Sequence, residues 1–107
     1  MMRLDAVVAL FPDLDAVELS AWIERRWVRP DQASGNGWVF TEIDIARVRL
    51  VRDLRHEMDI AEDTIPLVLA LMDQVYDLRR TLAAMARAIE DQPPDIRDAV
   101  LAALRRG

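Results

Sequence analysis

Cysteine and lysine are absent from this sequence, and histidine occurs once among its 107 residues. Without cysteine the chain has no disulfide, no thiolate metal site and no cysteine nucleophile. One histidine cannot build a histidine-rich metal site, and three glycines are too few for a glycine-rich phosphate loop. We therefore expect a protein that is not an enzyme and that holds no metal and no cofactor.

Long apolar runs are also missing. The longest, residues 65–72, has eight residues, whereas a helix that crosses a bilayer needs about 20. The apolar run near the N-terminus, residues 6–11, is shorter than the core of a signal peptide. These features predict a cytoplasmic protein that does not enter a membrane.

Basic residues are outnumbered, because 14 arginines stand against 19 acidic residues and give a net charge of −5. The first half shares the deficit, since residues 1–58 carry eight arginines and ten acids. Non-specific affinity for nucleic acid comes mainly from basic side chains that neutralise phosphates. The charge therefore argues against direct DNA binding by either half of the chain.

Two short helices are predicted near the N-terminus. Asp5 is suited to cap the first, which Pro12 ends. Asp15 followed by Glu18 resembles a capping box and starts a second helix that extends to about Trp27. The 3.6-residue spacing predicts that its buried face contains Leu14, Val17, Ala21 and Trp22. A short helix, a turn with proline and an amphipathic helix are the outline of a helix-turn-helix.

The next segment, residues 28–40, breaks the helical pattern. Pro30 and residues 33–37 are typical of turns. Val28 on one side and residues 38–40 on the other favour β-structure. The sequence therefore predicts a small two-stranded hairpin, which would be the wing of a winged helix-turn-helix.

A longer helix is predicted from the cap Thr41 to about Met58, with Asp44 near its positive end. Its predicted buried stripe consists of Ile43, Ala46, Leu50 and Leu54, with Val51 beside it. Its outward side carries Arg49, Arg52 and His56, with Arg55 adjacent. This patch has two interpretations, a contact surface or a solvated helix face paired with acids such as Asp53 and Glu57.

The last long helix is predicted to start at the cap Thr64 and to end near Asp91, before Pro93 and Pro94. Apolar residues repeat along it with the heptad spacing of a coiled coil. They are Leu71, Val75, Leu78, Leu82, Met85 and Ile89. Packing on its own domain would also explain such a stripe, but we favour the interface of a homodimer.

Three regions follow from this pattern: a winged helix-turn-helix domain at 1–63, a dimerisation helix at 64–91 and an amphipathic helical extension at 92–107. The extension begins at about Asp95 and places Ile96, Val100 and Leu104 on one face. It is predicted to fold back on the long helix or on the partner's, or to stay partly mobile.

Three runs of residues resemble the chaperone modulator CbpM family: Trp38-Val39-Phe40, Leu54-Arg55-His56-Glu57 and Ala70-Leu71-Met72-Asp73. Their order and separation match the family as well, and the likeness covers residues 3–90. The resemblance implies a mainly α-helical fold, a MerR-like winged helix-turn-helix followed by a long coiled-coil helix. It also implies a homodimer that binds the J-domain of a CbpA- or DnaJ-like co-chaperone, blocks stimulation of DnaK and opposes DNA binding by the co-chaperone.

The residues that would contact a J-domain are not fixed by this pattern. A J-domain offers a basic helix face and a short loop with an acidic tip, so a mixed surface would suit it. The acidic candidates are Glu18, Glu24, Asp73 and Asp77. The candidates for the loop are Arg52, Arg55 and His56, and Trp38 is either a contact or a residue packed on the helices. The alternative function is that of a MerR-type transcription regulator.

Overall fold

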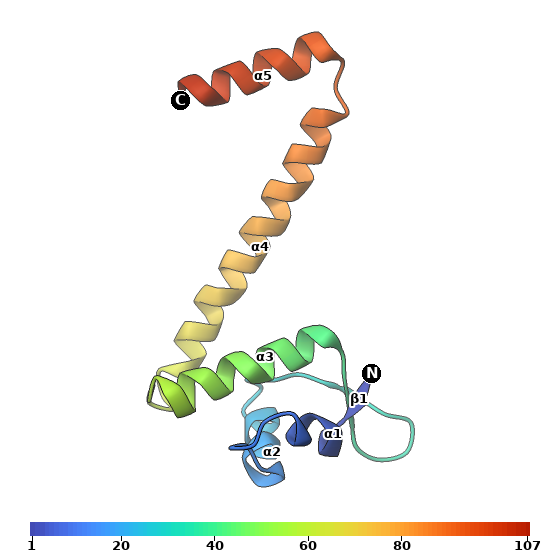
Figure 1. Cartoon of the computed structure of the whole chain (residues 1–107), viewed down its shortest axis with the longest axis vertical. Helices are drawn as coiled ribbons and strands as arrows, with labels where there is room; N and C mark the ends of the chain where they lie inside the picture. The colour runs from blue at the N-terminus through green and yellow to red at the C-terminus, as the bar shows by residue number, and fades with distance from the viewer. The chain divides into compact units, whose positions relative to one another are not determined.

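The fold of all 107 residues, Met1–Gly107, is given by a computed structural model. The chain is mainly helical, with one small three-stranded antiparallel sheet and a long helix towards the C-terminus (Figure 1). It divides into two units, Met1–Leu69 and Ala70–Gly107, which are described separately. The mainly α-helical class predicted from the sequence is confirmed at this level.

Helix α1 (Leu4–Ala9) begins two residues earlier than a cap at Asp5 requires. Its N-cap is Arg3, whose side chain makes no capping bond, and Asp5 lies in the first turn. The predicted cap is therefore wrong. The reason is the preceding strand, because Arg3 is held in extended backbone by pairing with Val39 and the helix starts as soon as that pairing ends.

Helix α2 (Ala16–Glu24) starts as predicted, since the Asp15 carboxylate accepts a hydrogen bond of 2.8 Å from the backbone N–H of Glu18. Its buried face is predicted only in part. Leu14 and Trp22 are buried as predicted, but Leu19 is buried as well and the side chain of Val17 is 81% exposed. The prediction counted from Leu14, which lies in the turn before the helix, and so assigned the wrong phase.

The end of α2 comes at Glu24 rather than near Trp27. Arg26 takes the left-handed conformation, with φ of 63°. The N–H of Trp27 donates to the carbonyl of Trp22, and the N–H of Arg26 donates to that of Ile23, both at 3.0 Å. These bonds form a Schellman motif, which reverses the chain at an arginine instead of the usual glycine.

The sheet has the strand order β1 (Met2–Arg3), β3 (Trp38–Phe40), β2 (Asp31–Gln32). The predicted hairpin is present, with Asp31 opposite Val39, but its first strand starts at Asp31 and not at Val28. Val28 is fully buried outside the sheet. The third strand was not predicted, because two residues are too few to show an alternating pattern.

Helix α3 (Glu42–Arg52) begins with a complete capping box. The N–H of Thr41 donates to the Asp44 carboxylate at 2.8 Å, and the N–H of Asp44 donates to the Thr41 hydroxyl at 3.3 Å. The helical path continues to the predicted end through a π-helical segment, η1 (Asp53–Glu57). The cap prediction is confirmed, and the π-turn is a feature that no residue pattern reports.

The buried side of α3 also differs from the prediction. Ile43 is 69% exposed and Ala46 is exposed, whereas Val48 and Val51 are fully buried and Leu54 is buried as predicted. Two apolar stripes overlap in this helix, and both include Leu54. Leu50 of the predicted stripe and Ile45 are half-buried against the core cluster, and Val51 was predicted beside the stripe, so the buried face is rotated from the predicted one rather than opposite to it.

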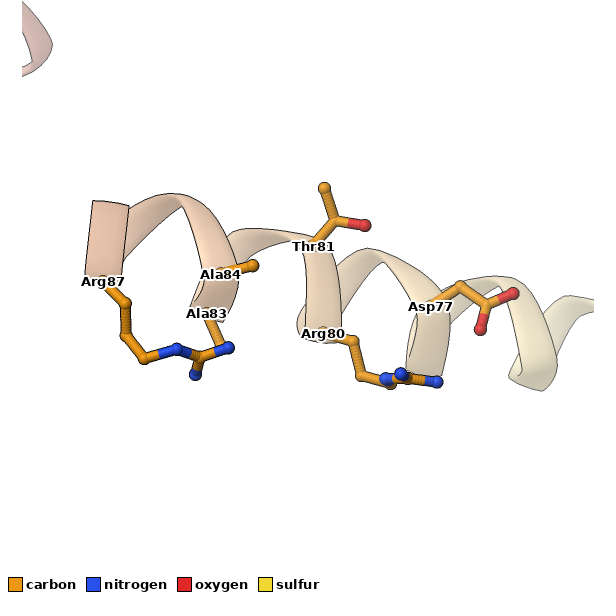
Figure 2. A pocket seen from close by; sticks show the side chains of 6 residues that line it. All are labelled: Asp77, Arg80, Thr81, Ala83, Ala84 and Arg87. Carbon is orange, nitrogen blue, oxygen red and sulfur yellow. The ribbon is translucent and has the colours of Figure 1, made fainter. Parts of the chain in front are cut away.

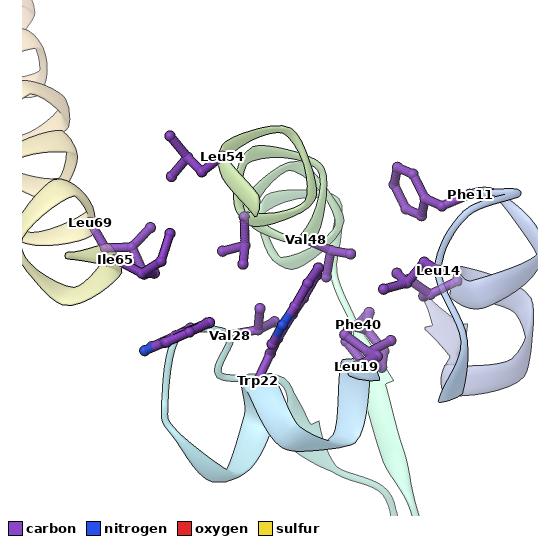
Figure 3. Close-up of a cluster of buried hydrophobic side chains, with 13 residues drawn as sticks. Phe11, Leu14, Leu19, Trp22, Val28, Phe40, Val48, Leu54, Ile65 and Leu69 are labelled. Carbon is purple, nitrogen blue, oxygen red and sulfur yellow. The ribbon is translucent and has the colours of Figure 1, made fainter. Parts of the chain in front are cut away.

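The core of the first unit is a single apolar cluster (Figure 3). In this view the Trp22 ring lies at its centre, with Phe40 and Leu19 on one side and Ile65 and Leu69 on the other. The buried residues are Val7, Phe11, Leu14, Leu19, Trp22, Trp27, Val28, Phe40, Val48, Val51, Leu54, Ile65 and Leu69. The first turn of α4 (Ile65–Glu90) is thus part of this unit, and α4 begins directly after Thr64, as predicted.

The second unit contains the remainder of α4 and helix α5 (Pro94–Arg106). Helix α5 starts within one residue of the predicted position, directly after Pro93. None of residues 70–107 is buried. No helix in the structure combines the length and the apolar character that crossing a membrane requires.

Candidate protein-interaction surfaces

A polar cluster joins the turn before α2 to the end of α3. The guanidinium of Arg52 donates two bonds of 3.0 Å to the Asp13 carboxylate, from Nε and Nη2. The imidazole of His56 lies 3.2 Å from the same carboxylate through Nδ1, and 2.7 Å from Glu18 Oε1 through Nε2. Asp13 is therefore the centre of the cluster, although no residue pattern in the sequence drew attention to it.

The imidazole of His56 has a carboxylate at each of its nitrogens. A neutral imidazole has one N–H, so only the protonated ring donates to both Asp13 and Glu18. The bond to Glu18 is the main reason that the pKa of His56 is raised. Bonds from Arg52, and to a lesser extent from His56, lower the pKa of Asp13 to about 2. The cluster is thus most stable with all of its members charged.

The basic patch predicted on α3 is largely satisfied inside the first unit. Arg52 also contacts Asp53 at 2.9 Å, and the Arg55 guanidinium donates to the carbonyl of Ile60 and lies 3.8 Å from Glu62. The side chains of Arg52, Arg55 and His56 are only 20–26% exposed. Of the two interpretations of the patch, pairing with acids is the one that the contacts support.

The tryptophans do not form an exposed aromatic surface. Trp22 and Trp27 are buried in the core, and the Arg25 guanidinium lies 5.2 Å from the centre of the Trp27 ring. Trp38 is half-buried on β3 and packs against the core cluster. Trp38 therefore packs on the core, as one of its two predicted roles requires, and part of its ring stays accessible for the other role, contact with a partner.

The outer face of α2 is open and carries no basic residue. A shallow depression there is lined by Ala16, Val17, Ser20, Ala21 and Glu24. Glu24 is exposed, whereas Glu18, one turn and a half earlier, is directed to His56. Of the two acidic candidates on α2, Glu24 is the more exposed, and Glu18 is already bound to His56.

The predicted dimer stripe of α4 is uncovered in the single chain. Leu71, Val75, Leu78, Leu82 and Met85 are between 41% and 63% exposed, and Ile89 is half-buried. At about 100° per residue, this stripe lies about 140° around the helix from Ile65 and Leu69, which belong to the first core. The stripe is therefore not a continuation of the face that α4 presents to that core.

The opposite face of α4 carries mixed charge (Figure 2). It holds a shallow hollow lined by Asp77, Arg80, Thr81, Ala83, Ala84 and Arg87. Arg80 and Arg87 extend to the same side of the helix with Ala83 between them, and Arg80 lies 5.8 Å from the centre of the Tyr76 ring. Asp73, which is half-buried, lies on the same side two turns before Arg80. A hollow made by one helix has too few walls for a small molecule but suits a protein surface.

Arg80 and Arg87 were not among the predicted contact residues, although arginines seven residues apart fall on one helix face. No group of three or more histidine, aspartate or glutamate side chains is arranged to hold a metal ion. In comparisons with known proteins, no family model, no curated protein and no solved structure matches the chain.

Proposed function

We propose that this chain is a regulatory protein that acts in the cytoplasm by binding another protein. Its proposed target is the J-domain of a CbpA- or DnaJ-like co-chaperone, which it would keep from stimulating DnaK and from binding DNA. The proposal includes a MerR-like winged helix-turn-helix, made by α1, α2, the β2–β3 hairpin and α3, and a homodimer formed through α4. The resemblance to the CbpM family is its starting point.

The observation that carries the proposal is the charge of the surface around α2. In a winged helix-turn-helix that reads DNA, the second helix enters the major groove and needs basic residues nearby. Here the outer face of α2 presents Val17, Ser20 and Glu24, and the nearby arginines Arg52 and Arg55 are paired with acids. The shape suits a DNA reader, but the surface suits a protein partner.

The run Leu54-Arg55-His56-Glu57 takes a structural role in this proposal. Leu54 belongs to the core, Arg55 binds the carbonyl of Ile60, and His56 holds the first turns of α2 through Glu18. We therefore assign these residues to positioning α2 rather than to contacting the J-domain.

The contact surface is better assigned to the mixed-charge face of α4. Asp77, Arg80 and Arg87 lie away from the apolar stripe, so they stay accessible when two stripes pair. Asp77 suits the basic helix of a J-domain, and the two arginines suit its acidic loop. Glu24 stays a separate acidic candidate on α2. This assignment keeps two of the acidic candidates and replaces Arg52, Arg55 and His56.

Calorimetric titration of the full chain with the isolated J-domain tests the proposal. We expect heat at micromolar concentration, and weaker binding by roughly tenfold or more for the double variant Arg80→Glu/Arg87→Glu. The matched control Arg105→Glu/Arg106→Glu changes the charge equally at the end of α5 and should bind normally. Absence of heat from a folded sample would remove the proposal.

The alternative, a MerR-type DNA-binding regulator, is favoured by the order of the elements: two short helices, a hairpin and a longer helix. It requires a surface more basic than the one around α2. Retention on heparin at moderate salt, together with a sequence-specific gel shift, would favour this alternative over J-domain binding.

A further inference from the structure

Helix α5 has an apolar face that nothing in the single chain covers. Ile96, Val100 and Leu104 follow one another at intervals of four residues, with Ile96 45% and Leu104 64% exposed. The charged residues Asp98 and Arg105 lie on the other side of the helix. A helix of 13 residues is marginal on its own in water, so its order depends on packing of this face.

The stripe of α4 is wider than a two-stranded coiled coil needs. In such a coiled coil the positions that flank the stripe are usually charged. Here one flank consists of Gln74, Thr81 and Ala88, and the other consists of Met72, Arg79 and Ala86. Five of these six are uncharged, which is typical of a helix in a bundle, where more than one neighbour covers the apolar face.

Helix α5 is long enough to cover the C-terminal half of α4. Only residues 91–93 separate them, and short connections of this kind join antiparallel neighbours in helical bundles. At 1.5 Å per residue, α5 is about 20 Å long and reaches from Ile89 back to about Leu78. On the side of Thr81, that half of α4 has Ala84 and Ala88, and small residues there allow a second helix to approach closely.

We propose that the α4–α5 pair of one copy packs against the α4–α5 pair of a second copy and forms a four-helix bundle. In this bundle α5 lies along the part of the flank that contains Thr81 and Ala88, and Ile96, Val100 and Leu104 complete the apolar core. A stable interface takes about 20–30 residues from each side, and the stripe with its flanks supplies about half of that number. The apolar face of α5 supplies part of the other half. This inference rests on the homodimer of the proposed function and not on the identity of the target.

Sedimentation equilibrium of the full chain and of a chain that ends at Asp91 tests the bundle. We expect a dimer from the full chain, and a dimer dissociation constant about 100-fold larger after α5 is removed. All three tryptophans lie in the first unit, so an unchanged tryptophan spectrum shows that this unit still folds. Equal dissociation constants for the two chains would overturn the bundle and leave the face of α5 to another partner.

A pair of point variants separates loss of packing from loss of chain length. Ile96→Asp/Leu104→Asp should weaken the dimer as the truncation does, whereas Asp98→Asn/Arg105→Gln, on the other side of α5, should not. A full chain that is monomeric at high concentration would overturn the dimer and the bundle together. Binding to the J-domain is measured separately by calorimetry, so its outcome does not decide whether the bundle forms.

Discussion

The two units of the chain differ in how much of their apolar surface they bury. The first unit buries thirteen apolar residues in one cluster, buries no polar or charged side chain, and pairs Arg52, Arg55 and His56 at its surface. The second unit buries none of its residues and leaves most of its large apolar side chains more than a third exposed. The first unit therefore forms a buried core within a single chain. The second leaves its apolar side chains exposed, which is typical of a surface that binds another chain.

The largest effect should follow from a change in the core of the first unit. Trp22→Ala removes the largest buried side chain and should lower the free energy of unfolding by about 3–5 kcal/mol. Denaturant unfolding, followed by tryptophan fluorescence, measures it. Val17→Ala, on the exposed face of the same helix, should change stability by less than about 0.5 kcal/mol. If the two variants were equally stable, α2 would not bury the face assigned to it.

The second largest effect should follow from a change in the apolar stripe of the second unit. Leu78→Asp/Leu82→Asp places two carboxylates on the apolar stripe of α4, so we expect a monomer by light scattering with the first unit still folded. Arg80→Asp makes the same change of net charge on the opposite face of α4 and should remain a dimer. A dimer that survives the double change would contradict the assignment of the stripe.

The pH dependence of stability should come from the first unit. The pKa of His56 is raised above 6.5, so its contribution is fully present below about pH 6.5 and is lost as the pH rises through the folded-state value. The pKa of Asp13 is lowered to about 2, so its contribution is present above pH 3.8 and is lost as the pH falls towards 2. His56→Gln should therefore flatten the decline in stability that begins above about pH 6.5, as measured by thermal unfolding over a range of pH.

The smallest effect concerns the left-handed arginine that ends α2. Arg26→Gly relieves a conformation that costs an L-residue about 1 kcal/mol, so it should raise the free energy of unfolding by up to that amount. Its neighbour Arg25 has φ of −80° and contacts Glu62, so Arg25→Gly should give no gain. A stabilisation by both variants would mean that the gain does not come from φ.

Local signals predicted the parts of the fold that depend on local bonds. The caps at Asp15 and Thr41, the start of α4 after Thr64 and the existence of the hairpin all follow from residues within one or two turns. The end of α2 was missed because its motif uses Arg26, and a C-terminal signal is normally read from glycine.

Other differences come from competition that distant residues decide. Both apolar stripes of α3 fit a helix, and the core selected Val48 over Ile43 and Ala46. Asp53 and Glu57 contact Arg52 as one interpretation of the patch predicted, but Asp13, which also pairs Arg52, lies 39 residues earlier and was not predicted. Strand β1 exists only because β3 accepts it.

The most direct test of the difference between the units is hydrogen exchange measured over a range of protein concentration. We predict that amides in residues 70–107 become more protected as the concentration rises through the dimer dissociation constant. Amides in the core of Met1–Leu69 should exchange at the same rates throughout. Exchange in residues 70–107 that does not change with concentration would contradict the account, because the exposed face of α4 would then not be the interface of a second copy.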